Sequence, residues 1–349
     1  AHIDHGKCIK GDSRVLLENG IVLTAKDLFD LSEEKGLKFE EKEEHIVYDI
    51  KNLNLRVSSL NKESGKIEIK PIELAWKLKG GDLIKLKLRN GFEIATTPEH
   101  KFIVYDNLDF IEKESRDIKL GERIICPRRL DVKNEINIKE EILLRLAEKR
   151  IYIRLNEDYG NKVKKLILNN NLKEIAKKIG TELKYRSLYH GSWQNRYLLR
   201  DLIEVAKLFD IKLEEIYDNT EFIVYRTGAQ RGKNSNTMGL PKNFEDFYYL
   251  AGLLIGDGHH KKFIVGKPKL GDKFAEICKN LNIKLTFRTY DRTPEIVTNQ
   301  TLLEVLNSLF DYPKKNKSHN VKISDFVLKS PKKYSSKLLR GYFDTDGSV

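Results

Sequence analysis

The sequence has 349 residues, a length that favours two or three domains because a single hydrophobic core stops growing at about 250–300 residues. Lysine and arginine number 64 against 52 acidic residues, and the formal charge of +12 favours a polyanionic partner, although such charged surfaces also occur in heat-adapted proteins. Three cysteines without CxxC spacing disfavour a disulfide framework or a structural zinc site. No signal pattern and no apolar run near the roughly 18 residues of a membrane span are present, which indicates a cytoplasmic protein without a membrane partner.

The first seven residues read AHIDHGK and resemble the phosphate-binding loop of translational GTPases of the elongation factor 2 type. That loop continues with a serine or threonine for magnesium, but here Cys8 follows Lys7. Cysteine is a poor ligand for a hard cation, so we interpret residues 1–7 as a host remnant, or extein, interrupted by an inserted element. The only methionine is Met238, which predicts a fragment or processed segment, and we assign no nucleotide hydrolysis to it.

Residues 13–127 show short apolar alternations separated by turn signals, a pattern typical of β-strands. The clearest segment, IKLKLRNGFEIATT, predicts a hairpin in which Asn90 and Gly91 take the positive φ angles of a type I′ turn. The pair Asn19 and Gly20 repeats this signal near the start of the chain. The first third of the sequence is therefore predicted to be a small β domain.

Two motifs within this domain resemble inteins. The sequence from Cys8 reads CIKGDSRVLLENG, like the opening block of an intein, and residues 96–102 read TTPEHKF, like its second block. The resemblance covers residues 8–130 and implies the all-β, horseshoe-like Hint fold that inteins share with hedgehog autoprocessing domains. Gly11 and Asp12 are expected to shape the turn after the nucleophile.

The resemblance also implies the chemistry of the first splicing step, an N–S acyl shift. The Cys8 thiolate attacks the carbonyl carbon of Lys7, His100 protonates the departing amide nitrogen, and Thr97 hydrogen-bonds the junction and helps to stabilise the oxyanion. Singly, each residue has an ordinary structural interpretation, and only the joint pattern favours catalysis. No cofactor is needed for splicing.

The later splicing steps use the family's C-terminal His-Asn pair and the next host residue, which this sequence does not contain. Complete splicing in cis is therefore not expected. A separate C-terminal intein piece, where one exists, would allow splicing in trans and would be a partner together with the flanking translational GTPase exteins.

Helical patterns replace the strand patterns from about residue 139 to 217, so residues 131–243 are predicted to be a helical DNA-recognition insert and linker. Residues 171–216 resemble a helix-turn-helix of the lambda-repressor type, with a small residue, Ala176, at the helix crossing and Gly180 at the turn. A small helical bundle would show a similar pattern. The residues expected to enter the major groove of DNA are Lys184, Tyr185, Arg186 and Tyr189.

Residues 244–349 contain LAGLLIGDG and LRGYFDTDG, which resemble two copies of the LAGLIDADG motif of homing endonucleases. Two helices would pack closely through small residues and bring Asp257 and Asp346 together at their ends. These carboxylates form a hard oxygen site for Mg²⁺, which assists phosphodiester hydrolysis. The small residues are Ala251, Gly252, Gly256 and Gly341.

The endonuclease resemblance further implies a catalytic lysine at Lys322, although Ser324 stands where the family usually has proline. The basic residues expected to follow the phosphates of double-stranded DNA are Lys261, Lys262, Lys267, Lys269 and Arg288. The strands that would complete the second DNA-binding sheet after Asp346 are not in the sequence, so this fragment is expected to bind DNA with or without cutting it.

Together these features predict a multidomain chain with an all-β Hint horseshoe, an α-helical helix-turn-helix insert and an incomplete α+β LAGLIDADG domain. The predicted activities are protein splicing and site-specific DNA cleavage. A helix-turn-helix DNA-binding regulator remains an alternative, as does a free-standing homing endonuclease without splicing. The first alternative does not need the two aspartates, and the second does not need a cysteine directly after a GTPase loop.

Overall fold

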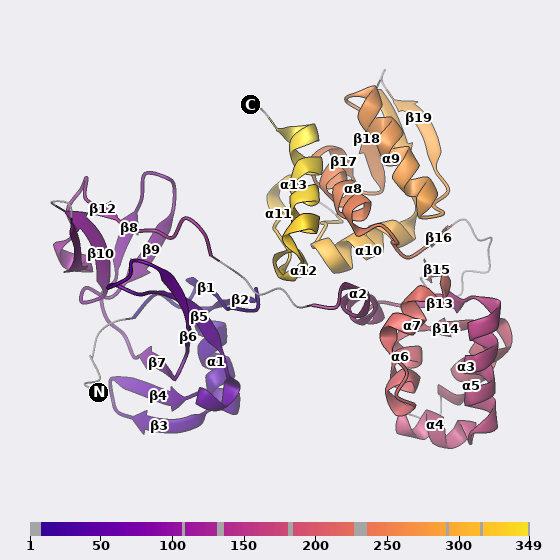
Figure 1. Ribbon diagram of the computed structural model, residues 1–349, viewed down its shortest axis with the longest axis horizontal. Helices are drawn as coiled ribbons and strands as arrows, with labels where there is room; N and C mark the ends of the chain where they lie inside the picture. Colours follow the sequence, from indigo (N-terminus) through magenta and orange to yellow (C-terminus); the bar gives the residue numbers. More distant parts are fainter. Residues whose placement is uncertain are drawn as a thin grey trace. The chain divides into compact units, whose positions relative to one another are not determined.

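The computed structural model describes residues 8–106, 109–130, 136–180, 184–226, 236–290, 293–314 and 317–347 (Figure 1). The chain divides into two compact units, Ala1–Asn134 and Glu135–Val349. The predicted host remnant at residues 1–7 and the side chain of Lys184 lie outside the described part of the chain. No helix of the described residues is long and apolar enough to cross a membrane.

The first unit consists mainly of short antiparallel strands. The strands are β1 (Arg14–Leu16), β2 (Val22–Thr24), β3 (Leu37–Glu41), β4 (His45–Asp49), β5 (Arg56–Leu60), β6 (Ile67–Pro71), β7 (Leu74–Leu78), β8 (Ile84–Lys87), β9 (Glu93–Thr96), β10 (Lys101–Asp106), β11 (Asp109–Glu114) and β12 (Arg123–Ile124). Among the described residues they pair as β1-β2, β3-β4-β7, β5-β6, β8-β9 and β11-β10-β12. Two 3-10 helices, η1 (Lys51–Leu53) and η2 (Ser115–Asp117), connect strands.

Helix α1 (Ala25–Lys35) corrects the prediction that this domain is all-β. Thr24 begins the helix with a capping box, because its hydroxyl accepts the Asp27 N–H at 3.0 Å and the Asp27 carboxylate accepts the Thr24 N–H at 3.2 Å. The helix buries Phe29 in a small core whose other fully packed members are Tyr48, Ile50 and Ala75. The Thr-x-x-Asp spacing was the sequence signal for this helix.

The hairpin predicted around Asn90 is confirmed by the pairing of β8 with β9, but its turn is not type I′. The Gly91 N–H donates to the Leu88 carbonyl at 2.9 Å, and the Leu88 N–H donates to the Phe92 carbonyl at 2.8 Å. Gly91 has a φ of +87°, whereas Asn90 is not among the residues with positive φ. The loop therefore has three residues, with only its glycine in the left-handed region. Gly20, at φ +81°, ends the β1-β2 turn in the same way.

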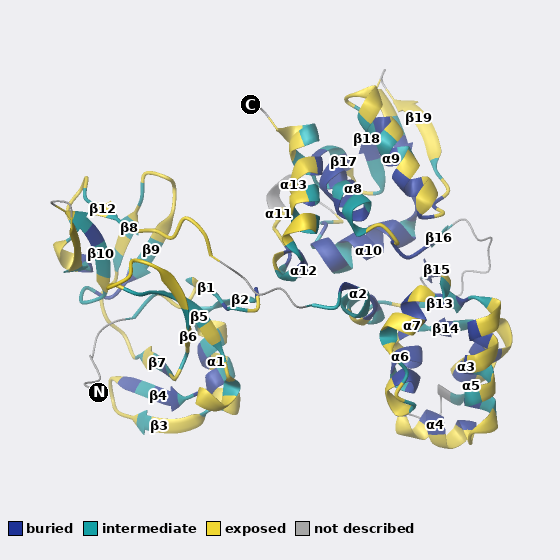
Figure 2. Cartoon of the chain, in the orientation of Figure 1, coloured by how far each residue is buried: buried dark blue, intermediate teal, exposed yellow. Residues whose placement is uncertain are grey.

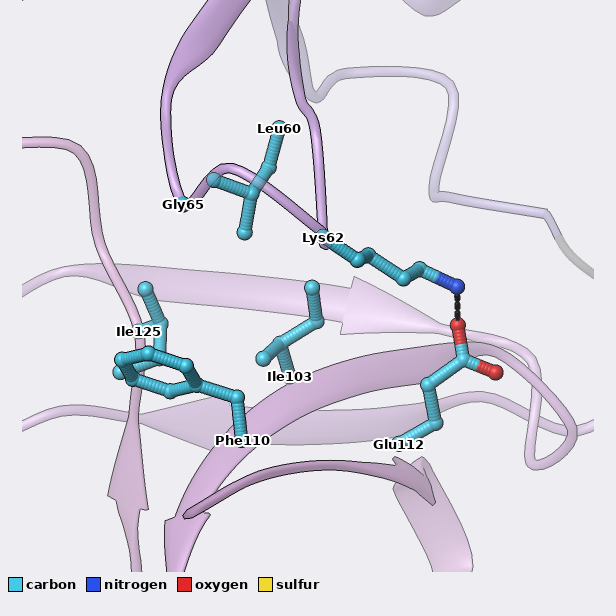
Figure 3. A pocket seen from close by; sticks show the side chains of 7 residues that line it. All are labelled: Leu60, Lys62, Gly65, Ile103, Phe110, Glu112 and Ile125. Atoms are coloured by element: carbon cyan, nitrogen blue, oxygen red, sulfur yellow. Dashed lines mark hydrogen bonds and ion pairs between the residues drawn. The ribbon is translucent and has the colours of Figure 1, made fainter. Parts of the chain in front are cut away.

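The turn of the β5-β6 hairpin is joined to the β11-β10-β12 sheet. Figure 3 shows Lys62 reaching from the turn to an ion pair with Glu112 of β11. A hollow of about 80 Å³ lies beside this pair. The apolar side chains that line it are Leu60, Ile103, Phe110 and Ile125. The two charged residues of its lining, Lys62 and Glu112, pair with each other.

The second unit contains two four-stranded sheets and most of the helices. Its first half contains α2 (Ile138–Ala147), β13 (Ile151–Leu155), α3 (Glu157–Asn169), α4 (Leu172–Lys178), α5 (Lys184–Gln194), β14 (Arg196–Leu198), α6 (Leu199–Leu208), α7 (Leu213–Asp218), β15 (Thr220–Tyr225) and β16 (Thr237–Met238). The strand order in this half is β14-β13-β15-β16. This sheet corrects the prediction of an α-helical insert, because short strands separate the helices.

The second half of this unit surrounds a helix pair. Its elements are α8 (Phe244–Asp257), β17 (Gly258–His259), β18 (Lys262–Ile264), α9 (Pro268–Asn280), β19 (Thr286–Tyr290), β20 (Thr293–Val297), α10 (Gln300–Phe310), α11 (Lys317–Asn320), α12 (Asp325–Lys329) and α13 (Lys332–Asp346). The strand order is β17-β18-β20-β19. One hydrophobic core runs through both halves, from Ile138 to Leu338. Figure 2 shows α8 and α10 largely buried and α13 largely exposed.

Candidate functional site

The backbone around Cys8 lies against the end of β9. Ile9 forms an antiparallel bridge with Thr96, the Lys10 N–H donates to the Ala95 carbonyl at 2.8 Å, and the Thr97 N–H donates to the Cys8 carbonyl at 3.0 Å. These bonds extend the β8-β9 hairpin by one short segment. They bring together two motifs that lie far apart in the sequence.

Thr97 contacts Cys8, and its role in the acyl shift stays a prediction. The Cys8 N–H donates to the Thr97 hydroxyl at 3.1 Å, and that hydroxyl is 3.5 Å from the Cys8 carbonyl oxygen. Thr97 is buried, whereas Cys8 is partly exposed. The nitrogen in this bond is the one that the acyl shift would release. The Lys7 carbonyl, where the oxyanion would develop, lies outside the described residues.

His100 follows Thr97 in a tight turn that the structure fixes from both sides. The His100 N–H donates to the Thr97 carbonyl at 3.1 Å, and the His100 carbonyl accepts the Ser115 N–H at 2.9 Å and its hydroxyl at 3.1 Å. The imidazole lies 4.9 Å from the Phe102 ring, measured between centroids. The role of the imidazole toward the junction stays a prediction.

Ser115 is a supporting residue that sequence reasoning missed. Its hydroxyl also shares a hydrogen bond with the Thr96 hydroxyl at 2.6 Å, so it joins the end of β9 to the turn that carries His100. Ser115 is buried at 2% exposure. A serine inside a charged segment carries no sequence signal for this role.

The Cys8 thiol lies at the rim of a cavity of about 410 Å³. Burial raises the pKa of the thiol, so the thiol form is favoured at neutral pH and attack requires local removal of its proton. The aromatic and aliphatic side chains on the other walls are Phe29, Trp76, Leu78 and Leu83. The site therefore contains the Cys8 thiol, the Thr97 hydroxyl that accepts a hydrogen bond from the Cys8 nitrogen, and a cavity beside both groups.

A second group of predicted residues lies where α8 meets α13. The helices cross with almost no side chain between them: a Cβ on Gly252 would collide with the Leu338 carbonyl, and one on Gly341 with the Tyr249 carbonyl. A Cβ on Gly256 would collide with the side chain of Thr345. The close packing through these glycines agrees with the prediction from the two motifs.

The crossing brings Asp257 and Asp346 near each other at the ends of the two helices. Burial raises the pKa of Asp257, and the charge of Asp346 raises it further, whereas Lys317 and Lys267 oppose this shift. The nearby Asp344 has a different partner. Its carboxylate accepts a hydrogen bond from the Tyr249 hydroxyl at 2.7 Å. Asp346 is therefore the aspartate of α13 that acts on Asp257, whereas Asp344 links α13 to α8 through Tyr249.

The structure places Lys317 close to Asp257 and Asp346. Its ammonium donates to the Gly256 carbonyl. Burial lowers its pKa, and the charges of Asp346 and Asp257 oppose this. The sequence motif had pointed to Lys322, which is exposed in the structure, and its catalytic role stays a prediction. The sequence did not predict Lys317 because this residue lies outside both LAGLIDADG-like motifs.

The two carboxylates suit a hard divalent cation. Asp257 and Asp346 offer oxygen donors whose mutual repulsion such a cation would relieve. Among the described residues, no group of three or more His, Cys, Asp or Glu side chains forms a metal site. Phosphate and water oxygens would therefore have to supply the remaining ligands.

The basic residues predicted to follow DNA differ in their surroundings. Lys262 forms an ion pair with Glu295 at 2.9 Å, and the Lys267 ammonium lies 3.4 Å from the Asp344 carbonyl. Lys269 and Arg288 are exposed. Lys261 is half-buried, and its carbonyl accepts hydrogen bonds from Thr298.

Helix α5 presents an aromatic row in which Tyr189 and Trp193 are exposed, whereas Tyr185 packs partly against the core. The rings of Tyr185 and Tyr189 stack with centroids 6.1 Å apart and an interplanar angle of 10°. Trp193 continues the row, and the Lys164 ammonium lies 3.7 Å from its ring centroid. Arg186 is exposed beside them. Trp193 was not among the predicted residues, although it follows Tyr189 by four residues, a spacing that places two side chains on the same face of a helix.

The neighbouring helix α4 contains the small residue that was predicted at a helix crossing, and the helix-turn-helix itself stays a prediction. Ala176 is fully buried, and Gly180 has a φ of +138° at the end of α4. Asn171 begins α4 by accepting the N–H groups of Lys173 and Glu174 at 3.2 and 3.4 Å.

The chain is similar to regions of longer archaeal proteins. Elongation factor 2 from Methanopyrus kandleri is 31% identical over 355 residues, which cover 100% of this chain and 28% of that protein. Probable translation initiation factor IF-2 from Methanocaldococcus jannaschii is 30% identical over 356 residues, covering 100% of this chain and 27% of that protein. The chain thus spans just over a quarter of the length of these curated relatives.

A solved structure is among the similar proteins, and a family model gives the assignment. The crystal structure of the TvoVMA intein matches with a TM-score of 0.32 and 24% identity, covering 35% of this chain and 70% of that chain. The sequence model of the intein splicing domain family matches residues 15–282, which is more than half of the sequence. This chain therefore belongs to the intein splicing domain family.

Proposed function

We propose that this chain begins protein splicing by an N–S acyl shift at the Lys7–Cys8 bond. The observation that carries the proposal is the 3.1 Å hydrogen bond from the Cys8 N–H to the Thr97 hydroxyl. It supports the proposal because it holds the scissile nitrogen beside a polar group in a partly buried site, where electrostatic interactions are stronger than in bulk water.

In the proposed step the Cys8 sulfur forms a bond to the Lys7 carbonyl carbon and the carbon–nitrogen bond breaks. The thiol loses its proton to water, and His100 gives a proton to the departing nitrogen and is reprotonated by water, so that a thioester and a free amine result with no net change in protons. The raised pKa of the thiol is consistent with a resting state in which the junction stays intact. Thr97 orients the nitrogen before it leaves.

A thiol-cleavage experiment tests this step. The chain is extended upstream by a reporter domain and incubated with dithiothreitol, and the release of the reporter is followed over time. Cys8→Ala is expected to abolish release, whereas Cys126→Ala, which removes an exposed cysteine, leaves the rate unchanged. Release that persists in Cys8→Ala would rule out the assigned nucleophile.

We infer that the host is a translational GTPase interrupted in its phosphate-binding loop. The AHIDHGK segment supports this inference, as do the printed names of the two relatives, which are a translation elongation factor and a translation initiation factor. The flanking exteins would then be the natural partners of the splicing reaction.

We further propose that the second unit is a LAGLIDADG homing endonuclease whose substrate is double-stranded DNA. The observation in its favour is the close crossing of α8 and α13 at Gly252 and Gly341, with Asp257 and Asp346 at the helix ends. A general helix pair does not need two glycines at its crossing and two carboxylates beside a lysine. The aromatic row of α5 supports a DNA-reading role for the helix-turn-helix.

In the proposed site Asp257 and Asp346 would hold Mg²⁺, which supplies charge stabilisation for phosphodiester hydrolysis. Lys317, held against the Gly256 carbonyl, would keep a positive charge beside both carboxylates. The exposed lysines and Arg288 would bind phosphates. The remaining predicted catalytic residue, Lys322, is retained in this proposal.

Plasmid cleavage tests the nuclease proposal. A plasmid that carries an uninterrupted elongation factor 2 gene is incubated with the chain and Mg²⁺, and nicked and linear products are measured. Asp257→Asn and Asp346→Asn are expected to abolish both products while DNA binding persists. Products formed equally by these variants would contradict the assignment of the carboxylates.

A further inference from the structure

The β14-β13-β15-β16 sheet has a cationic face that none of the motifs accounts for. On β13 the isoleucine and leucine side chains are fully buried, whereas Tyr152 and Arg154 are partly exposed. The strand register places Arg196 of β14 directly opposite Arg154, and Phe222 of β15 on the other side of Arg154. Two arginines and one phenylalanine therefore lie side by side across three neighbouring strands.

The aromatic rings hold these arginines in position. The guanidinium carbons of Arg154 and Arg196 lie 5.8 and 5.5 Å from the centroid of the Phe222 ring. The guanidinium carbon of Arg226, just after β15, lies 5.5 Å from the Tyr152 ring. Stacking on aromatic rings orients a planar guanidinium while leaving its N–H groups available.

The positive charge on this face is only partly neutralised. Glu221 lies 3.0 Å from Arg154. Burial lowers the pKa of Arg196, and the charges of Arg226 and Arg154 lower it further. The Arg196 Nε is buried and, within the described part of the chain, has no hydrogen-bond partner. Like charges opposite each other on a sheet are destabilising, so this arrangement would be relieved by a bound anion.

We propose that Arg154, Arg196 and Arg226 form a binding site for the phosphodiester backbone of double-stranded DNA. The inference rests on the proposed endonuclease function, because it adds a contact surface for the same DNA. Arginine suits this ligand because its guanidinium binds phosphate oxygens in a bidentate manner.

The dimensions of the face favour a polymer over a small anion. Neighbouring strands lie about 4.8 Å apart, so the two arginine-bearing strands and the end of β15, which Arg226 follows, cover roughly 10 Å. Successive phosphates of one DNA strand are about 3.4 Å apart along the helix axis and farther apart through space, so at least two phosphates match this span. The arginines lie on the face of a sheet, and a small anion would occupy only part of it.

Duplex binding by the full chain tests the proposal. Fluorescence anisotropy with a random-sequence duplex, measured at several salt concentrations, is compared between the wild type and a variant with Arg196→Gln and Arg226→Gln. A matched control with Lys207→Gln and Lys273→Gln removes the same charge from lysines that already have acidic partners.

The proposal predicts that the arginine variant binds about tenfold or more weakly and that its salt slope falls by about 1.8 units, whereas the control changes little. The thermal midpoint of the arginine variant should not fall, because the two substitutions relieve the repulsion among the three arginines. A purely structural role would instead lower the midpoint and leave the salt slope intact.

Three results would overturn the proposal. An unchanged slope in the arginine variant would refute the site while leaving the endonuclease proposal standing. An equal loss in the lysine control would show a general charge effect. Wild-type binding to inorganic triphosphate but to no duplex would assign the face to a small anion, and would also remove the support for a DNA substrate.

Discussion

At the scale of single residues, the junction depends on one hydroxyl and one turn. The Thr97 hydroxyl accepts the N–H of Cys8, and Ser115 holds the turn that carries His100. The motif blocks predict Cys8, Thr97 and His100 as the residues of the acyl shift, because the resemblance to inteins assigns them these positions. They missed Ser115, whose role depends on a contact across the sheet that no spacing in the sequence reveals.

Replacement of the Thr97 hydroxyl should slow the acyl shift. Thr97→Val keeps the shape of the side chain but removes the acceptor for the Cys8 N–H, and loss of about 1 kcal/mol from one hydrogen bond predicts roughly a fivefold lower rate. Thr97→Ser should retain most of the rate because it keeps the hydroxyl. The rate of thiol-induced reporter release measures both, and equal rates for valine and serine variants would remove Thr97 from the mechanism.

Asp257 should limit the stability of the unit that contains it. Its folded-state pKa is raised above the ordinary 3.8, so in the window above 3.8 the folded chain binds more protons than the unfolded chain. Stability is therefore highest below that window and falls as pH rises through it. Asp257→Asn should raise the thermal midpoint at pH 7 by about 1–3 °C, and this gain should vanish below pH 3.8.

Calorimetry at a series of pH values checks this prediction, with Asp272→Asn, on α9, as a control for loss of one aspartate charge. A wild-type protein that is more stable than Asp257→Asn at pH 7 would contradict the destabilising effect assigned to the burial of Asp257 and to the nearby charge of Asp346.

At the scale of elements, local signals explain part of the fold and tertiary contacts explain the rest. The asparagine–glycine pairs located two hairpins, but their turns place only the glycine in the left-handed region. Helix α1 was missed although Thr24 and Asp27 mark its start. Strands β13 to β16 were missed because segments of two to six residues between helices are too short for a periodic pattern to separate them.

The glycines at the α8-α13 crossing should tolerate no side chain. Gly252→Ala places a methyl group against the Leu338 carbonyl, and forced separation of the helices should cost about 1–3 kcal/mol. Gly239→Ala is the control, because a Cβ there would make ordinary contacts at 3.5 Å or more. Urea denaturation measures the free energy of unfolding, and similar losses for both variants would show that the crossing is not close.

At the scale of the whole molecule, the sequence predicted three domains with boundaries at residues 130 and 243. The structure has two compact units, and within the second one a single hydrophobic core runs from Ile138 to Leu338. Arg145 of α2 also reaches Asp325 of α12 at 2.9 Å and stacks on Phe326. The change in composition after residue 130 lies close to the division between the two units. Composition does not reveal the shared core of the later segments, since that core joins residues far apart in the sequence.

The Arg145 contact should stabilise the second unit most at neutral pH. Burial would raise the pKa of Asp325, but hydrogen bonds from Arg145 and Lys329 lower it to about 2. This contribution is present above the ordinary value of 3.8 and is lost as pH falls toward 2. Asp325→Asn should therefore cost about 1 kcal/mol at pH 7, a modest value because the carboxylate is partly exposed.

Denaturation at pH 7 and near pH 2 measures this difference. A gap between wild type and Asp325→Asn that persists unchanged at the lower pH would contradict an ionic origin. Glu214→Gln, on α7 of the same unit, removes one acidic charge and provides the control.

The central claim is that Cys8 forms a thioester with the carbonyl of Lys7, and trapping that thioester tests it most directly. The chain with an upstream reporter is treated with hydroxylamine, which cleaves thioesters rapidly and amides slowly, and the products are identified by intact mass. The predicted result is a reporter that ends in a Lys7 hydroxamate together with a chain that begins at Cys8, both missing in Cys8→Ala. A folded wild-type chain that yields no hydroxamate, or yields the same amount as Cys8→Ala, would contradict the account.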